Sequence, residues 1–187
     1  MKKILVFAVA ALAAISVSAQ TKIGHVNFTE LYQLMPEADE ARATMQAASK
    51  EAEETIQGMA EELQTKYQQY QQKSSSWTAA IKEAKEQELN DINNRIQQFQ
   101  QTVQQELQQQ QNQLMNPIIA KAQEAVKKLA KEKGITAVFD SGSAIYFDEA
   151  QTIDLTKEAR TALGIKEGRT LETLQQELAA SAQTEQK

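Results

Sequence analysis

One long stretch of the chain limits its fold more than any other feature, because residues 37–133 contain almost nothing that breaks a helix. Gly58 is the one glycine in this stretch and Pro117 is the one proline. Apolar residues recur along it at steps of three and four, the spacing of an amphipathic helix that packs against a partner helix. The stretch therefore predicts either one very long helical rod or two helices packed together.

Part of this stretch, residues 95–114, is rich in glutamine, a composition that is by itself often typical of disorder. Apolar residues nevertheless keep the coiled-coil spacing through it. They define a seam of Met45, Ala48, Ala52, Ile56, Met59, Leu63 and Tyr70 in the first half, and of Leu89, Ile92, Ile96, Phe99, Val103, Leu107, Leu114, Ile118, Ala122, Val126 and Leu129 in the second. The glutamines are interpreted as solvent-facing positions, since glutamine favours helix and carries no charge.

A turn inside the stretch is predicted near Ser75, in the serine-rich residues 73–77. The serines alone leave an alternative open, since an apolar register through Tyr70, Trp77 and Ile81 would permit one unbroken rod. A rod of about 80 residues would hold its ends about 120 Å apart at 1.5 Å per residue. Because predicted strands lie at both ends, a helical hairpin that brings them together is favoured.

The predicted strands are short. Residues 22–28 alternate in polarity and form the first, and a short helix is predicted over residues 29–35. After Gly134, residues 135–139 and 144–147 read as a β-hairpin around the turn residues 140–143. The first strand is expected to pair with one of these two.

Proline marks both ends of the predicted arm. Pro36 followed by Glu37 is a good helix opening, because proline at the first position loses no needed N–H and an acid there favours the helix dipole. Pro117 removes one helical hydrogen bond and clashes with the preceding turn. We therefore expect a kink or restart there, where arm meets body.

The last elements are a helix capped by Asp154 or Thr156 and ended by Gly164, a weaker helix over residues 170–180, and a disordered tail. The predicted fold class is mainly α with a small β body. Its predicted parts are a signal peptide at residues 1–19, a β-containing trimerisation body at residues 20–36 and 116–164, a coiled-coil hairpin arm at residues 37–115, and a C-terminal helix with a flexible tail at residues 165–187.

The first residues predict export. Lys2 and Lys3 precede a short apolar run that ends in the small-residue pattern Val17-Ser18-Ala19, which is typical of a secretory signal cleaved after Ala19. A retained membrane anchor is disfavoured, because about 20 apolar residues are needed to cross a bilayer and this run is shorter. The expected location is the periplasm, with no stable membrane insertion once the signal is removed.

The chain has no cysteine, so the exported protein is expected to be stable by packing alone. Loss of Lys2 and Lys3 with the first 19 residues, which contain no acid, changes the formal net charge from −5 to −7. An acidic chain is a poor general ligand for nucleic acid, so no nucleic-acid partner is expected.

Residues for catalysis are sparse. His25 is the only histidine, it lies on a predicted strand, and no cysteine or second histidine accompanies it to build a metal site. The acids are spread over helix faces among lysines and glutamines, which indicates solvated surface rather than an acid and base pair. The sequence predicts no enzyme, no catalytic or metal-binding residue, and no cofactor.

Large soft and aromatic side chains lie on or near the predicted seam. Most such residues simply pack between two helices, but some of this surface is expected to be exposed near the tip. Methionine and amphipathic aromatics suit adaptable binding of many partners. The candidate residues for binding a protein client are Met59, Tyr67, Tyr70, Trp77 and Met115.

The order of these segments resembles the Skp/OmpH family of periplasmic chaperones. The resemblance covers the mature chain to about Gly164, and three features carry it: the first strand, with Lys22, Ile23, Val26 and Asn27; the predicted hairpin; and the helix opening Asp154-Leu155-Thr156. The chain differs from the best-known family member in being acidic rather than strongly basic, and in having a segment after Gly164.

The resemblance implies a homotrimer whose small β-barrel body carries three arms around a cavity, in which unfolded outer-membrane β-barrel proteins are held without ATP. Three short strands cannot close a barrel within one chain, which is an independent reason to expect assembly. The residues expected in the trimer body are Ile23, Val26, Phe28, Val138, Phe139, Ile145 and Phe147. The alternative is a structural, scaffolding coiled-coil protein of the envelope without a client.

Overall fold

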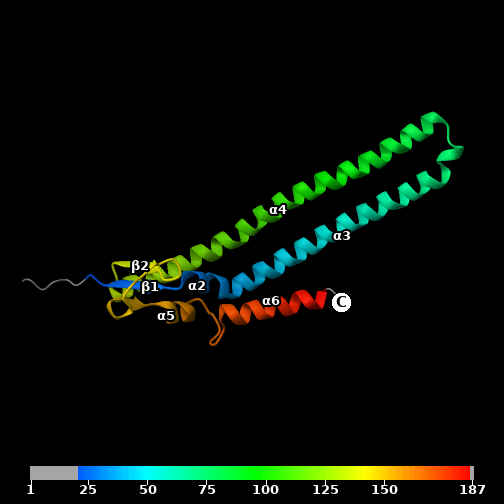
Figure 1. The fold of residues 1–187 in the computed structure, drawn as a ribbon. Helices are drawn as coiled ribbons and strands as arrows, with labels where there is room; N and C mark the ends of the chain where they lie inside the picture. Colours follow the sequence, from blue (N-terminus) through cyan, green and yellow to red (C-terminus); the bar gives the residue numbers. More distant parts are fainter. Residues whose placement is uncertain (1–20, 186–187) are drawn as a thin grey trace, which may run out of the picture.

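A computed structural model describes residues 21–185 and shows a long two-helix arm that projects from a small body (Figure 1). The predicted signal peptide and its cleavage after Ala19 lie outside the described residues. The elements in chain order are β1 (Ile23–Val26), α2 (Phe28–Leu34), α3 (Pro36–Lys73), η1 (Ser74–Ser76), α4 (Ala79–Lys133), β2 (Ala137–Asp140), η2 (Glu149–Gln151), β3 (Ile153–Asp154), α5 (Thr156–Ala162) and α6 (Leu171–Glu185). The predicted fold class, mainly α with a small sheet, is confirmed.

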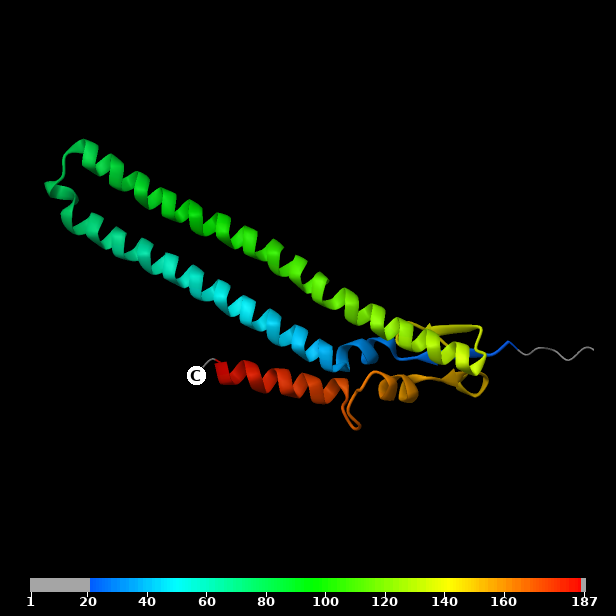
Figure 2. The same ribbon diagram turned by 180° about the vertical axis from the view of Figure 1, so that it is seen from behind.

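The arm is an antiparallel pair formed by α3 and α4, seen from both sides in Figures 1 and 2. Pro36 occupies the first turn of α3 together with Glu37 and Asp39, as the opening predicted. The chain turns back at η1, where the Thr78 hydroxyl accepts a hydrogen bond from the Ile81 N–H at 3.4 Å and caps α4. The hairpin with its tip near Ser75 is confirmed, and the single rod is wrong.

Pro117 does not interrupt α4, so the predicted restart there is wrong. The helix runs from Ala79 to Lys133 with Pro117 inside it. Proline removes one backbone hydrogen bond, but the turns on both sides keep theirs. Ile118, Ala122 and Val126 also bury one face of the helix against the body, and this packing favours a continuous α4.

The sheet has the order β2-β1-β3, and β1 pairs in parallel with both neighbours. Ile23 lies opposite Ala137 and Gly24 opposite Ile153. Parallel neighbours need a crossover connection, and here the entire arm is the crossover between β1 and β2. Gly134 begins the return in the left-handed conformation (φ 66°), which releases the chain from α4 toward β2.

The pairing of residues 22–28 with residues 135–139 is confirmed, but the predicted β-hairpin is wrong because residues 144–147 form no strand. The Asp140 carboxylate accepts hydrogen bonds from the Phe28 N–H at 3.0 Å and the Gly142 N–H at 3.1 Å. These bonds favour a tight turn that leads the chain away from β2. The second neighbour of β1 is β3 instead.

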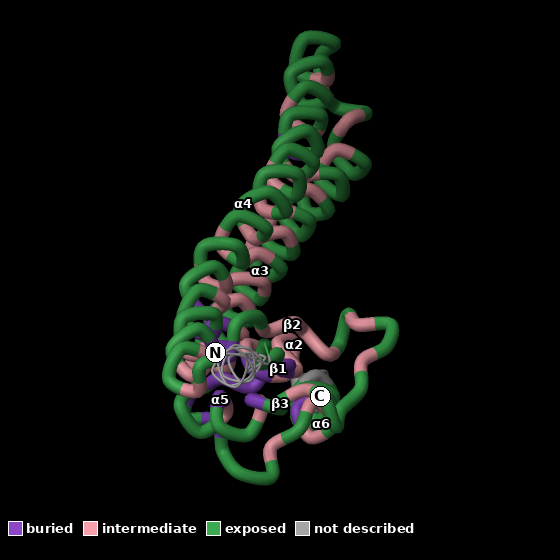
Figure 3. The backbone as a smooth tube through the Cα atoms, turned by 90° about the vertical axis from the view of Figure 1, so that its left-hand side faces the viewer, coloured by how far each residue is buried: buried purple, intermediate pink, exposed green. Residues whose placement is uncertain are grey.

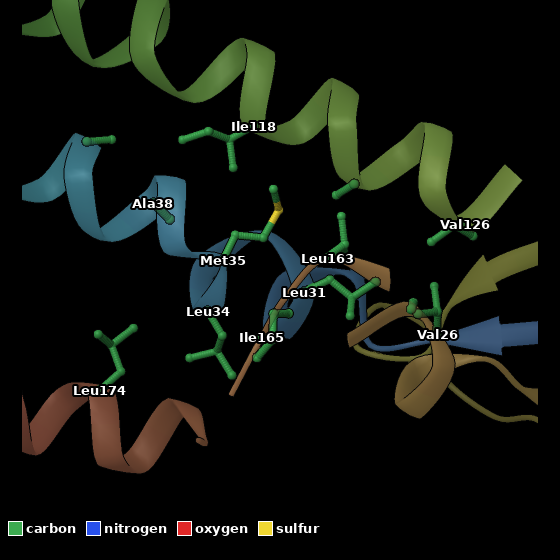
Figure 4. Packing of buried hydrophobic residues seen from close by; sticks show 13 residues of the cluster. Val26, Leu31, Leu34, Met35, Ala38, Ile118, Val126, Leu163, Ile165 and Leu174 are labelled. Carbon is green, nitrogen blue, oxygen red and sulfur yellow. The ribbon is translucent and has the colours of Figure 1, made fainter. Parts of the chain in front are cut away.

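The hydrophobic core lies in the body, around α2. Leu31, Leu34 and Met35 are fully buried, and Ile118 on α4 and Leu174 on α6 cover them from opposite sides (Figure 4). Figure 3 shows the consequence: buried residues gather in the body, while the arm is mostly half-buried and exposed. The body is therefore the well-packed unit from which the arm projects.

The C-terminal part completes this core. The N-cap residue of α5 is Leu155, which makes no side-chain cap bond, so the predicted cap by Asp154 or Thr156 is wrong. Asp154 instead accepts a hydrogen bond from the Thr156 N–H at 2.8 Å in the turn that leads into the helix. Gly164 ends that segment with a φ of 70°, as predicted. The last helix, α6, runs to Glu185 and thus includes most of the segment that was expected to be a flexible tail. Among the described residues, none of the helices is both long enough and apolar enough for a membrane span.

Candidate functional site

The seam of the arm is only partly closed. Ile92 is buried, with 4% of its surface exposed, whereas Ile96, Phe99 and Val103 on the same helix are half-buried. Two helices cover each other along one side only, so the seam residues keep part of their surface in solvent. The arm therefore presents a discontinuous line of apolar surface along its length.

Near the tip this line widens into a groove of about 640 Å³ between α3 and α4. Tyr67 and Tyr70, both predicted client-binding residues, line it together with Leu63 and Leu89. Tyr67 is 52% exposed, so half of this large side chain faces solvent at the groove. The remaining lining is Ala60, Gln64, Glu86, Asn90 and Asn93, so the groove has an apolar floor beside polar groups.

Tyr70 is fixed in place by two neighbours. Its hydroxyl donates a hydrogen bond to the Glu86 carboxylate on the opposite helix, and this bond raises the pKa of Tyr70 above its ordinary value. Its ring packs edge-on against Trp77, with centroids 5.7 Å apart and planes at 69°. Trp77 therefore supports one wall of the groove, and the three predicted aromatic residues form one group at the tip.

Ion pairs between the two helices hold this part of the arm in register. Glu88 pairs with Lys66 across the hairpin and with Lys85 on its own helix at 2.7 Å. Hydrogen bonds from Lys66 and then Lys85 lower the pKa of Glu88 to about 2. Arg95 pairs with Glu62 at 2.9 Å. Exposed pairs contribute little stability, so their main effect here is to fix which residues face each other.

A second groove, of about 350 Å³, lies nearer the middle of the arm. Ala48 and Ala52 face Phe99, Val103 and Leu107 across it. The apolar spacing of these residues predicts seam packing and does not predict the groove. A sequence signal for the groove is the pair of small alanines at seam positions, because a methyl group cannot fill the space opposite a larger side chain.

The other two predicted client-binding residues lie apart from the tip. Met59 is half-buried on α3 and lines neither groove. Met115 packs against the hydrophobic core of the body. The structure thus brings together Tyr67, Tyr70 and Trp77, and separates the two methionines from them.

The residues predicted for the trimer body occupy two different environments. Val26 is buried in the core, and Phe28 and Val138 pack against it. Ile23 is 39% exposed and Ile145 is fully exposed, next to Tyr146 at 83%. Phe139 and Phe147 are half-buried, with ring centroids 5.2 Å apart. The start of β1 and the loop after β2 therefore carry apolar surface that the chain itself does not cover.

His25 on β1 lies in surroundings typical of a structural residue. It is buried, its ring lies 4.6 Å from that of Phe147, and its Nδ1 is 3.0 Å from the Thr152 hydroxyl. Its Nε2 is 3.8 Å from a carboxylate oxygen of Asp154. Within residues 21–185, no cluster of three His, Cys, Asp or Glu side chains is arranged to hold a metal ion.

Comparison with known proteins identifies the family of this chain. A family model described as "Outer membrane protein (OmpH-like)" matches residues 22–163. The chain belongs to the OmpH-like family. This OmpH-like chain is 30% identical over 155 residues to the "Chaperone protein Skp" of Yersinia enterocolitica, across 80% of this chain and 93% of the relative. It is 27% identical over 150 residues to the protein of that name in Pectobacterium atrosepticum, across 79% and 91%.

The OmpH-like match includes the sheet, the arm and α5 but ends at Leu163. The loop that follows and the helix α6 lie outside it. These C-terminal residues nevertheless contribute Ile165 and Leu174 to the hydrophobic core of this OmpH-like chain. They are therefore an integral part of its body.

Proposed function

We propose that the protein is an ATP-independent holdase chaperone of the periplasm, which binds unfolded outer-membrane proteins and prevents their aggregation. The observation that carries the proposal is the tip groove, where exposed Tyr67 lies beside an apolar floor on a projecting arm. Membership of the OmpH-like family and similarity to proteins named chaperones support it. The predicted signal sequence supports the location.

The grooves suit an unfolded chain rather than a folded one. An unfolded β-barrel protein exposes alternate apolar side chains along extended segments. Separate grooves along the seam accept such side chains one at a time, while the amide and carboxylate groups beside them bond to the client backbone. Binding spread over weak sites is reversible, so release of the client needs no nucleotide.

The proposed assembly is a homotrimer built through the body. Within the described residues, β2 and β3 pair only with β1, so each leaves an edge without a partner strand. Ile145 and Tyr146 extend from the loop after β2 with most of their surface in solvent. A second copy of the chain would cover both the free edges and these side chains.

A specific contact between copies follows from the shape and charge of the body. A pocket of about 450 Å³ between β2 and α4 has an apolar lining with Val126 and Val138, and it also includes Lys127 and Lys131. The loop with Ile145 and Tyr146 continues into Asp148 and Glu149. We propose that this loop enters the pocket of the next copy, since apolar and charged groups then match, and that the head-to-tail contact closes into a ring.

The holdase proposal is tested by aggregation of a denatured outer-membrane β-barrel protein, followed by light scattering at near-stoichiometric ratio. The parent should suppress aggregation, and Tyr67→Ser should suppress it less. The matched control is Ile81→Ser, which removes an apolar residue of similar exposure (44%) on the same arm but outside the groove. No suppression by the parent would favour the scaffold alternative, and equal loss in both variants would show that the groove is not the site.

The assembly proposal is tested by the mass of the protein in solution. Tyr146→Asp alters the loop and Val138→Asp alters the pocket, and each should abolish the trimer. A mixture of the two should form heterodimers, because the intact loop of the Val138→Asp chain can enter the intact pocket of the Tyr146→Asp chain. Leu178→Asp, an exposed apolar residue on α6, is the control and should remain trimeric. A trimer in the Tyr146→Asp variant would contradict the proposed contact.

A further inference from the structure

The joint between arm and body has two sides: α4 passes through it without interruption, whereas the other side is a short break between two helices. Helix α2 ends at Leu34 and α3 begins at Pro36, with Met35 extended between them (φ −62°, ψ 144°). Because no helical hydrogen bonds continue across Met35, the joint on this side is free to bend unless other contacts hold it. From Pro36 to Gln68 on α3 is about 48 Å at 1.5 Å per residue, so a change of about 10° at the joint moves that position by about 8 Å.

The loop at residues 164–170 is bonded to both sides of this joint. Arg160 at the end of α5 pairs with Glu30 on α2, and it also holds the loop by hydrogen bonds to the Lys166 and Arg169 carbonyls at 3.3 and 2.5 Å. Arg169 in turn pairs through both terminal nitrogens with Asp39 in the first turn of α3. The loop thus bridges α2 and α3 across the break.

The bridge is two-pronged and partly shielded from solvent. Only 13% of the Arg169 side chain and 16% of the Arg160 side chain are exposed. A paired arginine fork fixes direction as well as distance, because its two N–H groups lie in one plane with the carboxylate. Arg42 links α3 directly to α2, because it donates to the Asp39 carboxylate and, at 3.1 Å, to the Gln33 carbonyl on α2.

The same segment is anchored to the body by apolar packing. Ile165 and Leu174 are buried in the core cluster on either side of the loop, at 7% and 5% exposure. Arg169 also lies 3.6 Å from Glu177 on α6. Figures 1 and 2 show α6 extending from this point in the direction of the arm. The loop therefore has a rigid support against which it holds α3.

We propose that residues 164–185 are a brace that sets the angle between arm and body, with Arg169 as the residue that positions α3. The brace lies outside the part of the chain that matches the family, so it is a feature of this chain beyond the shared fold. If the arm holds clients, as the proposed function states, the brace limits how far the arms spread and so which client sizes fit between them. The brace itself does not depend on that function.

The test is a distance distribution between two spin labels in the full chain. The described residues contain no free cysteine, so Gln68→Cys on the arm and Gln151→Cys on the body give one label pair per chain. Labelled chains are diluted with unlabelled ones, so that distances between copies do not contribute. The parent should give one narrow distribution. Arg169→Gln should broaden it and shift its mean by several ångström, and Arg169→Lys, which keeps the charge but not the fork, should fall between the two.

The control variant is Arg95→Gln, which breaks another arginine–carboxylate pair, more exposed and made through one nitrogen, on the arm and away from the joint. Asp39→Asn removes the partner of Arg169 and should reproduce the broadening. The proposal can therefore still be tested if one of the two variants folds poorly. Circular dichroism and thermal unfolding show whether each variant retains its helices. An unchanged distribution in folded Arg169→Gln and Asp39→Asn, or equal broadening in Arg95→Gln, would overturn the brace. The measurement uses no client, so failure of the holdase proposal would leave its result unaffected.

Discussion

Arg169 and Asp39 lie 130 positions apart in the chain, and Arg169 Nη2 lies 2.6 Å from Asp39 Oδ1. This pair joins the C-terminal segment to the first turn of the arm. It lies at the point where small changes in angle have the largest effect at the tip. The pair therefore links the packing of the body to the position of the grooves proposed to bind clients.

The pair predicts how stability depends on pH. Hydrogen bonds from Arg169 and then Arg42 lower the pKa of Asp39 below its ordinary value, so folding favours the carboxylate. The pair then stabilises the fold above the ordinary aspartate pKa, and this stabilisation is lost as the pH falls through the lowered pKa. In urea unfolding, Asp39→Asn should lower the free energy of unfolding by about 1 kcal/mol at neutral pH. The effect is this small because solvent screens the partly exposed pair.

The difference between parent and Asp39→Asn should shrink as the pH falls below about 4. Glu40→Gln removes an exposed carboxylate next to Asp39 and is the matched control, with a small effect expected at neutral pH. A difference for Asp39→Asn that grows toward acid would contradict the assigned sign.

The body core predicts a large loss of stability on truncation of Leu34, which lies on α2 and is fully buried in the core cluster. Leu34→Ala should lower the free energy of unfolding by about 2–5 kcal/mol, because it loses burial and leaves a cavity. Urea denaturation at fixed protein concentration measures this, because the proposed assembly would make stability depend on concentration. Leu178→Ala, at a residue 44% exposed, should change it by less than about 0.5 kcal/mol. Equal costs would show that the core is misassigned.

Truncation of a buried seam residue should destabilise the arm locally. Ile92 is buried between the limbs, so Ile92→Ala should destabilise the neighbouring turns of α3 and α4 by about 2 kcal/mol and speed their amide hydrogen exchange. Ile81→Ala, at an exposed position of the same helix, is the control. Exchange should remain unchanged in the body. Equal protection of the arm in parent and Ile92→Ala would argue against packing at this position.

Glu88 predicts a titration that nuclear magnetic resonance can follow directly. Its pKa of about 2 arises first from the hydrogen bond of Lys66 and then from that of Lys85. The side-chain carboxyl carbon of Glu88 should therefore report ionised carboxylate down to about pH 3. Lys66→Gln should raise the midpoint more than Lys85→Gln does. A midpoint near that of an ordinary glutamate would show that the pair across the hairpin does not form in solution.

Local sequence determined the arm. The apolar spacing of the seam, Pro36 as the opening of α3, and the serines at the tip each act within a few residues, so they can be read without knowledge of the rest of the fold. The aromatic group at the tip followed for the same reason, because Tyr70 and Trp77 flank the turn that brings them together. The grooves could not be predicted from local sequence, because they depend on how the side chains of two separate helices pack.

Tertiary structure decided the features that local signals left open or misread. Residues 144–147 have the composition of a strand, but the bonds to Asp140 turn them away and β3 pairs with β1 in their place. Pro117 carries a helix-breaking signal, but burial of Ile118 and Ala122 favours a continuous helix. The contact of Arg169 with Asp39 has no signature in sequence, because many arginines and acids of a charged chain could pair. Only the packing of Ile165 and Leu174 into the core brings these two together, since burial of distant apolar groups determines which charges meet.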